Sequence, residues 1–151
     1  MANGRGYRAK VTATGGNGIT VESIMAGASG RLWIRGLEVN VSSGQPADLE
    51  SLLYVDRVTA SGTATALGST NIAPDDMSDA GHEEGKVHKE HSGEPTYASR
   101  PFYEAYFNHR VKERILLAPD DFWEISTGQG MGNRLTSTGT PLSRSMISWK
   151  E

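Results

Sequence analysis

Three of the four histidines stand close together in a polar segment that also carries several carboxylates. Residues 82–91 read His-Glu-Glu-Gly-Lys-Val-His-Lys-Glu-His. Imidazoles beside carboxylates are the ligands of many zinc and iron sites, and jelly-roll barrels can hold such metals. The spacing differs from the helical HExxH motif, because Lys86 stands where the second histidine would be. Only Val87 is available to anchor the segment in a core, so a solvated loop is the favoured interpretation. The alternative is a cupin-like metal enzyme that uses His82, His88 and His91 with Glu83 or Glu84.

Two further groups have the residue types of an active site without its spacing. Asp120 and Asp121 are adjacent, and adjacent strand residues point to opposite faces, so they are expected to stabilise a turn after Pro119. No serine stands in a Gly-x-Ser-x-Gly motif. The run Gly-Gln-Gly-Met-Gly at 128–132 lacks the Gly-Lys-Ser/Thr ending of a phosphate-binding loop. We therefore expect no enzyme, no bound metal and no cofactor.

Aromatic side chains gather between Tyr97 and Phe107, which hold five of the eleven aromatic residues. Strand alternation would place Tyr103 and Phe107 on a core face, and Phe102 and Tyr106 on the opposite, exposed face. Exposed aromatics near arginines are typical of protein–protein contacts. The sequence therefore predicts an interface at Phe102 and Tyr106, with a second buried layer as the alternative.

The start of the chain is a second candidate for the interface. Residues 1–6 are small, polar and basic, which predicts a flexible arm. Arg5, Tyr7 and Arg8 either order on a partner or belong to a disordered basic tail. We include these three residues in the predicted interface.

Composition indicates one cysteine-free domain rich in turns. A length of 151 residues suits a single domain, and the absence of cysteine excludes disulfides and thiolate sites. A net charge of −3 argues against a nucleic-acid-binding protein. No apolar run approaches the ~18 residues of a membrane-spanning helix, and the first residues lack the apolar core of a signal peptide. The 18 glycines favour many short strands joined by turns.

Apolar and polar residues alternate over much of the chain, which predicts an all-β antiparallel sandwich or jelly roll of about eight strands with long loops. One of these strands spans residues 31–41. One of its faces would carry Trp33, Leu37 and Val39, and the other would carry Ile34, with a bulge near Gly36. The densest apolar run lies at 115–118, before the Pro119 corner. Strands are expected at 7–13, 19–24, 31–41, 52–59, 103–111, 115–118, 122–125 and 146–149. The domain would span residues 7–151, with a polar insertion loop at about 74–95 and a glycine-rich loop at 128–139.

The order of these segments is similar to that of a known group of proteins. The segments are Leu32-Trp-Ile-Arg-Gly-Leu-Glu-Val-Asn-Val41, Leu52-Leu-Tyr-Val-Asp-Arg-Val58, Ala73-Pro74-Asp75, Arg114-Ile-Leu-Leu-Ala-Pro-Asp-Asp-Phe122 and Trp149-Lys-Glu151. In this layout the chain resembles the small jelly-roll virion proteins of tailed bacteriophages, the capsid decoration or cement proteins and related head structural proteins.

The resemblance implies a non-enzymatic protein on the outer surface of the capsid. Such proteins bind the major capsid protein, bridge its subunits and are often homotrimers, so neither nucleic acid nor membrane is an expected partner. A symmetric oligomer that grips several subunits gains affinity through effective concentration, even when each contact is modest. A second interpretation from the residues is a carbohydrate-binding adhesin or fibre tip, because exposed aromatic rings also stack on sugars.

Overall fold

The protein is an all-β sandwich. The computed structural model describes residues 6–14, 17–28, 30–41, 50–68, 71–74, 85–98, 100–117, 122–137 and 142–151, and these residues form thirteen strands. The strands are β1 (Gly6–Thr14), β2 (Asn17–Met25), β3 (Leu32–Val41), β4 (Glu50–Ala60), β5 (Thr63–Ala66), β6 (Ile72–Pro74), β7 (Lys86–Gly93), β8 (Thr96–Tyr97), β9 (Tyr103–Asn108), β10 (Glu113–Leu116), β11 (Trp123–Ile125), β12 (Gly130–Ser137) and β13 (Leu142–Lys150). The predicted fold class is confirmed. The predicted strand number was too low, because strands of two to four residues are too short to show an alternating pattern.

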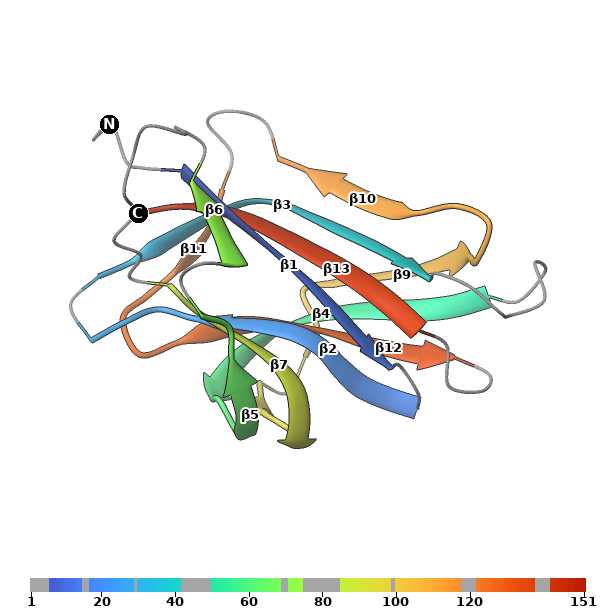
Figure 1. Cartoon of the computed structure of the whole chain (residues 1–151), viewed down its shortest axis with the longest axis horizontal. Helices are drawn as coiled ribbons and strands as arrows, with labels where there is room; N and C mark the ends of the chain where they lie inside the picture. Colours follow the sequence, from blue (N-terminus) through green and yellow to red (C-terminus); the bar gives the residue numbers. More distant parts are fainter. Residues whose placement is uncertain are drawn as a thin grey trace.

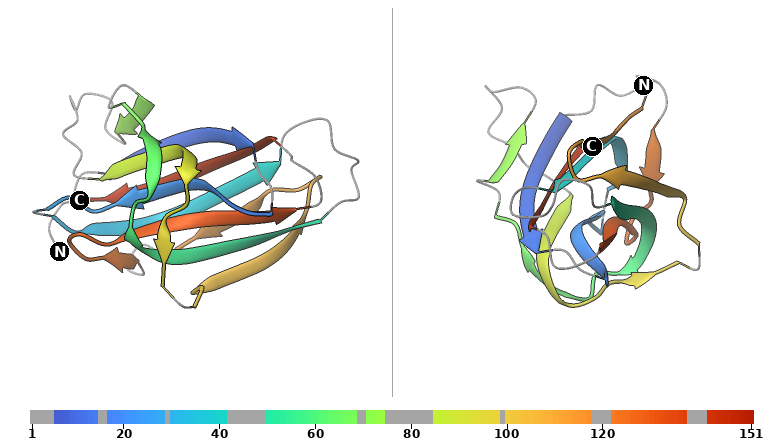
Figure 2. Two further views of the ribbon diagram at one scale, coloured as in Figure 1. Left: turned by 90° about the horizontal axis from the view of Figure 1, so that it is seen from below. Right: turned by 90° about the vertical axis from the view of Figure 1, so that its right-hand side faces the viewer.

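Two antiparallel sheets form the sandwich (Figure 1). Sheet A has the order β10-β3-β13-β1-β6, and β11 also pairs with β3. Sheet B contains β12-β4-β8 with β9 on β4, together with β2-β7-β5. Strand β2 runs beside β12, where the Ala26 N–H donates to the Gln129 carbonyl at 2.8 Å. Figure 2 shows the same strands from two further sides. No helix of the described residues is long and apolar enough to cross a membrane.

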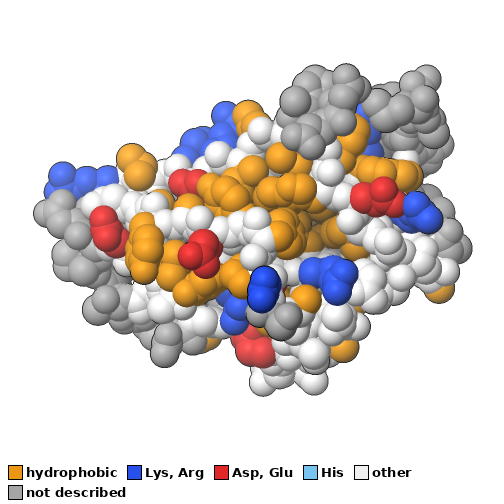
Figure 3. Space-filling model, turned by 180° about the vertical axis from the view of Figure 1, so that it is seen from behind, with side chains coloured by type: hydrophobic (Ala, Val, Ile, Leu, Met, Phe, Trp, Pro, Cys, Tyr) orange, Lys and Arg blue, Asp and Glu red, His pale blue; other side chains and the backbone are white. Residues whose placement is uncertain are grey.

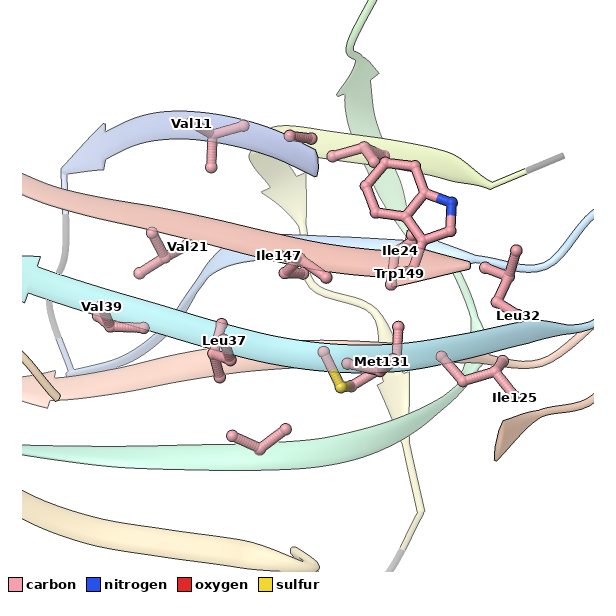
Figure 4. Packing of buried hydrophobic residues seen from close by; sticks show 14 of the residues in the cluster. Val11, Val21, Ile24, Leu32, Leu37, Val39, Ile125, Met131, Ile147 and Trp149 are labelled. Atoms are coloured by element: carbon pink, nitrogen blue, oxygen red, sulfur yellow. The ribbon is translucent and has the colours of Figure 1, made fainter. Parts of the chain in front are cut away.

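The core lies between the sheets and is filled from alternate positions of the longer strands (Figure 4). Ile147 and Trp149 of β13 are fully buried, and Tyr7 of β1 stacks on Trp149 with ring centroids 5.8 Å apart. The prediction that Tyr7 belongs to an exposed contact surface is therefore wrong. Gly6 already pairs with Lys150, so the first strand begins at the last residue of the expected arm, one residue before the expected start of the domain. Arg5 lies outside the described residues.

Strand β3 contains the expected bulge, but its position changes which residues face the core. The β13–β3 register passes from Ser148↔Gly36 to Trp149↔Ile34, which leaves Arg35 as the extra residue. The bulge resets the alternation, so Ile34 faces the core together with Leu37. Trp33, which was predicted to share the face of Leu37, is only partly buried.

Residues 130–137 form a central strand, where the glycines predicted a loop. Every residue from Gly130 to Asn133 is buried in β12. A Cβ on Gly132 would lie 2.8 Å from the Tyr97 hydroxyl and 3.2 Å from a Val58 methyl group. Glycine is needed here because neighbouring side chains approach the backbone closely. Loops are also rich in glycine, so the composition of this segment alone does not distinguish a strand from a loop.

The predicted polar loop contains a strand of eight residues, β7, so the loop prediction is wrong at 86–93. Its pairing explains why so polar a segment is ordered. His88 lies opposite Ser23, and Val87, opposite Ile24, is buried. Strand β5 pairs along the other edge of β7. The remainder of the expected insertion, at 75–84, lies outside the described residues, as do the turn at 118–121 with Pro119, Asp120 and Asp121, and residues 138–141.

Candidate contact surface

One side of the sandwich is formed by a strand from each sheet. Among the described strands, β9 pairs only with β4 and β10 pairs only with β3, so each of them is an edge strand of its sheet. A short turn joins them, closed by the Val111 N–H, which donates to the Asn108 carbonyl at 3.0 Å. Both strands lie on the same side of the molecule (Figures 1 and 2). We call residues 103–116 the β9–β10 edge.

The β9–β10 edge carries the most exposed large apolar side chains in the described part of the chain. Tyr106 is 71% exposed, Leu116 65% and Val111 57%. Seen from behind, hydrophobic side chains form a broad band across the molecule (Figure 3), and the right-hand view of Figure 2 places the β9–β10 segment on this side. Large exposed apolar side chains that gather on one edge are typical of a site of interaction.

Aromatic rings close the space between the sheets beneath this edge. Phe102 packs edge-on against Trp123 of β11, with ring centroids 4.8 Å apart, and Tyr103 lies 6.4 Å from the same ring. The Tyr103 hydroxyl donates to the Glu113 carboxylate at 2.5 Å, which links β9 to β10. Burial first, and then this carboxylate, raises the pKa of Tyr103 to about 12. The Tyr103–Glu113 hydrogen bond therefore joins the two strands of the edge.

The predicted interface residues lie in three different environments. Phe102 and Tyr106 are both exposed, as their phase in the strand indicated, but Phe102 supports Trp123 whereas Tyr106 lies opposite Leu52 of β4. Arg8 is exposed on β1, which β13 and β3 separate from β10. Only Tyr106 therefore belongs fully to the β9–β10 edge. Sequence reasoning missed Leu116, because the apolar run at 115–118 predicts a strand but does not show that the strand lies at the edge of a sheet.

A cavity of about 480 Å³ opens next to Phe102. Phe102, Phe122 and Trp123 supply aromatic surface, and Arg57 and Gln129 supply polar groups. Sequence reasoning also missed this site, whose walls come from segments far apart in the chain. The mixture of rings and polar groups suits a ligand that has both apolar and hydroxyl-bearing faces.

A polar network covers the outer face of sheet B. Arg134 donates two hydrogen bonds to Asp56, at 2.8 and 2.5 Å, and its guanidinium lies 4.4 Å from the centre of the Tyr97 ring. Tyr97 contacts the Thr20 hydroxyl, which also donates to Glu94. Burial raises the pKa of Tyr97 well above its usual range. These groups bind one another and hold β8 on the sheet, which is a structural role.

The histidines of β7 are half-buried side chains of a strand, and the expectation of a solvated loop is wrong for them. His91 Nε2 lies 3.0 Å from the hydroxyl of Ser23, which is fully buried and closed to a substrate. Burial lowers the pKa of both His88 and His91. Within the described ranges, no group of three histidine or carboxylate side chains is placed to hold a metal ion. His82, Glu83 and Glu84 lie outside those ranges.

The C-terminal Trp-Lys-Glu segment has a packing role. Glu151 accepts hydrogen bonds from the Gly85 N–H at 2.8 Å and from the Trp149 indole at 3.0 Å. This carboxylate ties the segment before β7 to the largest side chain of the core.

Comparison of the chain with protein-family models, with curated proteins and with solved structures found no match. The function is therefore argued from the geometry of the surface and from the layout of the sequence.

Proposed function

We propose that the protein is a non-enzymatic structural protein of a virion, which binds the outside of a bacteriophage capsid and stabilises it by bridging subunits of the major capsid protein. The observation that carries the proposal is the β9–β10 edge, where Tyr106, Val111 and Leu116 expose apolar surface. The layout of the sequence, which resembles decoration proteins, supplies the identity of the partner.

The physical role follows from linkage. A ligand that binds the assembled shell and not its separated subunits stabilises the shell by mass action. A homotrimer, which the resemblance favours, would present three copies of the edge at once and gain affinity through effective concentration. A surface whose side chains are already packed loses less conformational entropy on binding, and the Phe102–Trp123 contact and the Tyr103–Glu113 hydrogen bond support the edge in this way.

Co-sedimentation with purified heads tests the proposal. The unmodified protein should sediment with heads of the phage that encodes it, and the treated heads should withstand higher temperature. Tyr106→Ala should weaken binding by roughly 2 kcal/mol, about 30-fold, if Tyr106 is a hot spot of the contact. The matched control is Ile19→Ala, which trims another partly exposed apolar side chain on β2. Failure of the unmodified protein to sediment with heads would contradict the proposal.

The cavity beside Phe102 favours a second candidate function, a carbohydrate-binding module of an adhesin or fibre tip. Rings of Phe102, Phe122 and Trp123 could stack on the apolar face of a pyranose, while Gln129 and Arg57 contact its hydroxyls. A glycan array separates the candidates. Saccharide binding that is lost in Trp123→Ala, without binding to heads, would favour the adhesin.

A further inference from the structure

The outward side of sheet A is strongly basic, although the chain as a whole is acidic. Alternation along β1 and β13 turns Ala9 and Ile147 into the core and their neighbours outward. The outward positions of β1, β3, β10 and β13 carry six cations: Arg8, Lys10, Arg35, Arg114, Arg144 and Lys150. Among the described outward positions of these four strands, Glu38 is the one carboxylate, and Glu124 of β11, opposite Trp33, is a second on the same side of sheet A. We call this surface the basic face.

The segregation of charge is pronounced. The chain has 15 lysines and arginines against 18 aspartates and glutamates. Six of those cations lie on one face of one sheet, so the rest of the molecule carries a larger acidic excess than the net charge of −3 suggests. A surface potential of one sign over several strands attracts partners of the opposite sign and accelerates their association.

The centre of the basic face combines cations with apolar groups. Arg8, Arg35 and Arg114 line one shallow hollow of about 270 Å³ together with Leu116 and Met146. Glu38 also lines this hollow, and its carboxylate lies 3.3 Å from the Lys112 amine and 3.7 Å from Arg114. The second acid on this side, Glu124, pairs with Arg31 at 2.6 Å. Arginine mixed with exposed aliphatic side chains is the composition of protein interfaces.

We infer that the basic face docks onto an acidic surface of another protein. A flat sheet face cannot enter a nucleic-acid groove, which admits a helix or a two-stranded ribbon. Single-stranded nucleic acids do bind sheet faces, but their bases stack on aromatic rings, and no described aromatic side chain lines the hollow of the basic face. This inference goes beyond the proposed function, because it concerns a different surface and does not depend on the identity of the partner.

Binding to immobilised poly-L-glutamate tests the inference. The unmodified protein should bind at about 20 mM NaCl and lose most of its affinity at about 300 mM, where the Debye length is shorter than the spacing of the contacts. The double variant Lys10→Glu with Arg144→Glu reverses two exposed cations of the basic face and should bind at least ~10-fold more weakly. The matched control, Lys86→Glu with Arg100→Glu, makes the same charge change at exposed positions elsewhere and should bind within about twofold of the unmodified protein.

Three outcomes would overturn the inference. The first is an equal loss of binding in the control pair, which would show that net charge alone governs binding. The second is tighter binding to heparin or to duplex DNA than to poly-L-glutamate, which would identify a different class of partner. The third is self-association of the protein at low salt that disappears in the Lys10/Arg144 variant, because the acidic surface would then belong to a second copy. If the charge reversal prevents folding, Lys10→Gln with Arg144→Gln removes the charges instead, and the same comparisons apply.

Discussion

Glu22 is the side chain least suited to its surroundings. It is fully buried in β2, and neither carboxylate oxygen makes a hydrogen bond of ordinary geometry to a described residue. Its backbone N–H donates to the Asn133 side chain at 3.0 Å, and Asn133 donates to the Ser145 hydroxyl at 2.7 Å, which connects the two sheets through polar groups. Burial raises the pKa of Glu22 to about 8, an effect that the nearby Ser145 hydroxyl partly offsets.

The raised pKa of Glu22 predicts a loss of stability as pH rises. The unfolded carboxyl releases its proton near pH 4.5 and the folded one near pH 8, so the folded state binds more protons between these values. The free energy of unfolding should therefore fall by up to about 1.4 kcal/mol per pH unit across this range. Glu22→Gln should abolish that slope and stabilise the protein most at pH 8, as measured by urea unfolding. Glu104→Gln, at an exposed position on β9, is the control, and a slope that persists in Glu22→Gln would contradict the assignment.

Phe102 and Tyr106 should differ in what their removal costs the fold. Phe102 is 46% exposed but packs edge-on against Trp123, a contact worth about 1 kcal/mol. Phe102→Ala should therefore lower the melting temperature and alter the fluorescence of Trp123. Tyr106→Ala should leave both unchanged. Equal melting temperatures for the two variants would show that the Phe102–Trp123 pair does not support the edge.

At the scale of elements, the glycines of β12 determine how closely the strands of sheet B approach. Gly132→Ala would push against the Tyr97 ring, whose hydroxyl lies 2.8 Å from the added methyl position. We expect a destabilisation of about 1–3 kcal/mol by thermal unfolding, because the displaced ring also contacts Arg134 and Thr20. Thr136→Ala, at a partly buried position of the same strand, should cost less. A neutral Gly132→Ala would mean that Tyr97 is free to move.

Strands with a regular alternation could be predicted from the sequence, and strands held by their neighbours could not. β1 has a clean two-residue pattern, and its core residues Ala9, Val11 and Ala13 follow directly from it. β13 was predicted only over 146–149, because its first half exposes Leu142 and buries Ser143 and Ser145, against the apolar pattern. β7 has one buried apolar side chain and is ordered because β2 and β5 pair with its two edges. Pairing partners of this kind depend on the whole topology, which local patterns do not contain.

The same distinction applies to the candidate contact surface. The exposure of Tyr106 followed from the phase of β9, because alternate residues of a strand point to opposite faces. β9 and β10 are edge strands on the same side of the sandwich because of the order of the strands in the two sheets. Local sequence patterns do not contain this order. The apolar run at 115–118 predicted a strand but not its place in a sheet, and the position of β10 at an edge exposes Leu116.

For the whole molecule, His88 and His91 oppose Glu22 in the response to pH. Burial lowers the pKa of both imidazoles below 6.5, although the charge of Glu94 partly offsets this for His91 and that of Lys86 adds to it for His88. Below pH 6.5 the unfolded chain therefore binds more protons at these two histidines than the folded chain does. Their contribution to the free energy of unfolding is complete above pH 6.5 and is lost as the pH falls below that value.

Substitution separates the two histidines from the buried carboxyl. His88→Gln with His91→Gln should remove the loss of stability that these imidazoles cause below pH 6.5 and leave the opposite slope of Glu22 there. The limb above pH 6.5 should not change. The measurement is urea unfolding at closely spaced pH values. If the acid limb persists in the double variant, the protons bind elsewhere.

Strand β10 belongs to two surfaces at once, because Leu116 flanks the β9–β10 edge and also lines the hollow of the basic face with Arg114. The two surfaces therefore meet around a corner of the sandwich. A flat neighbour can touch only one of them, whereas a concave neighbour, or the seam between two adjoining molecules, can enclose both. The shape of the corner would then determine the orientation in which the protein binds its neighbour.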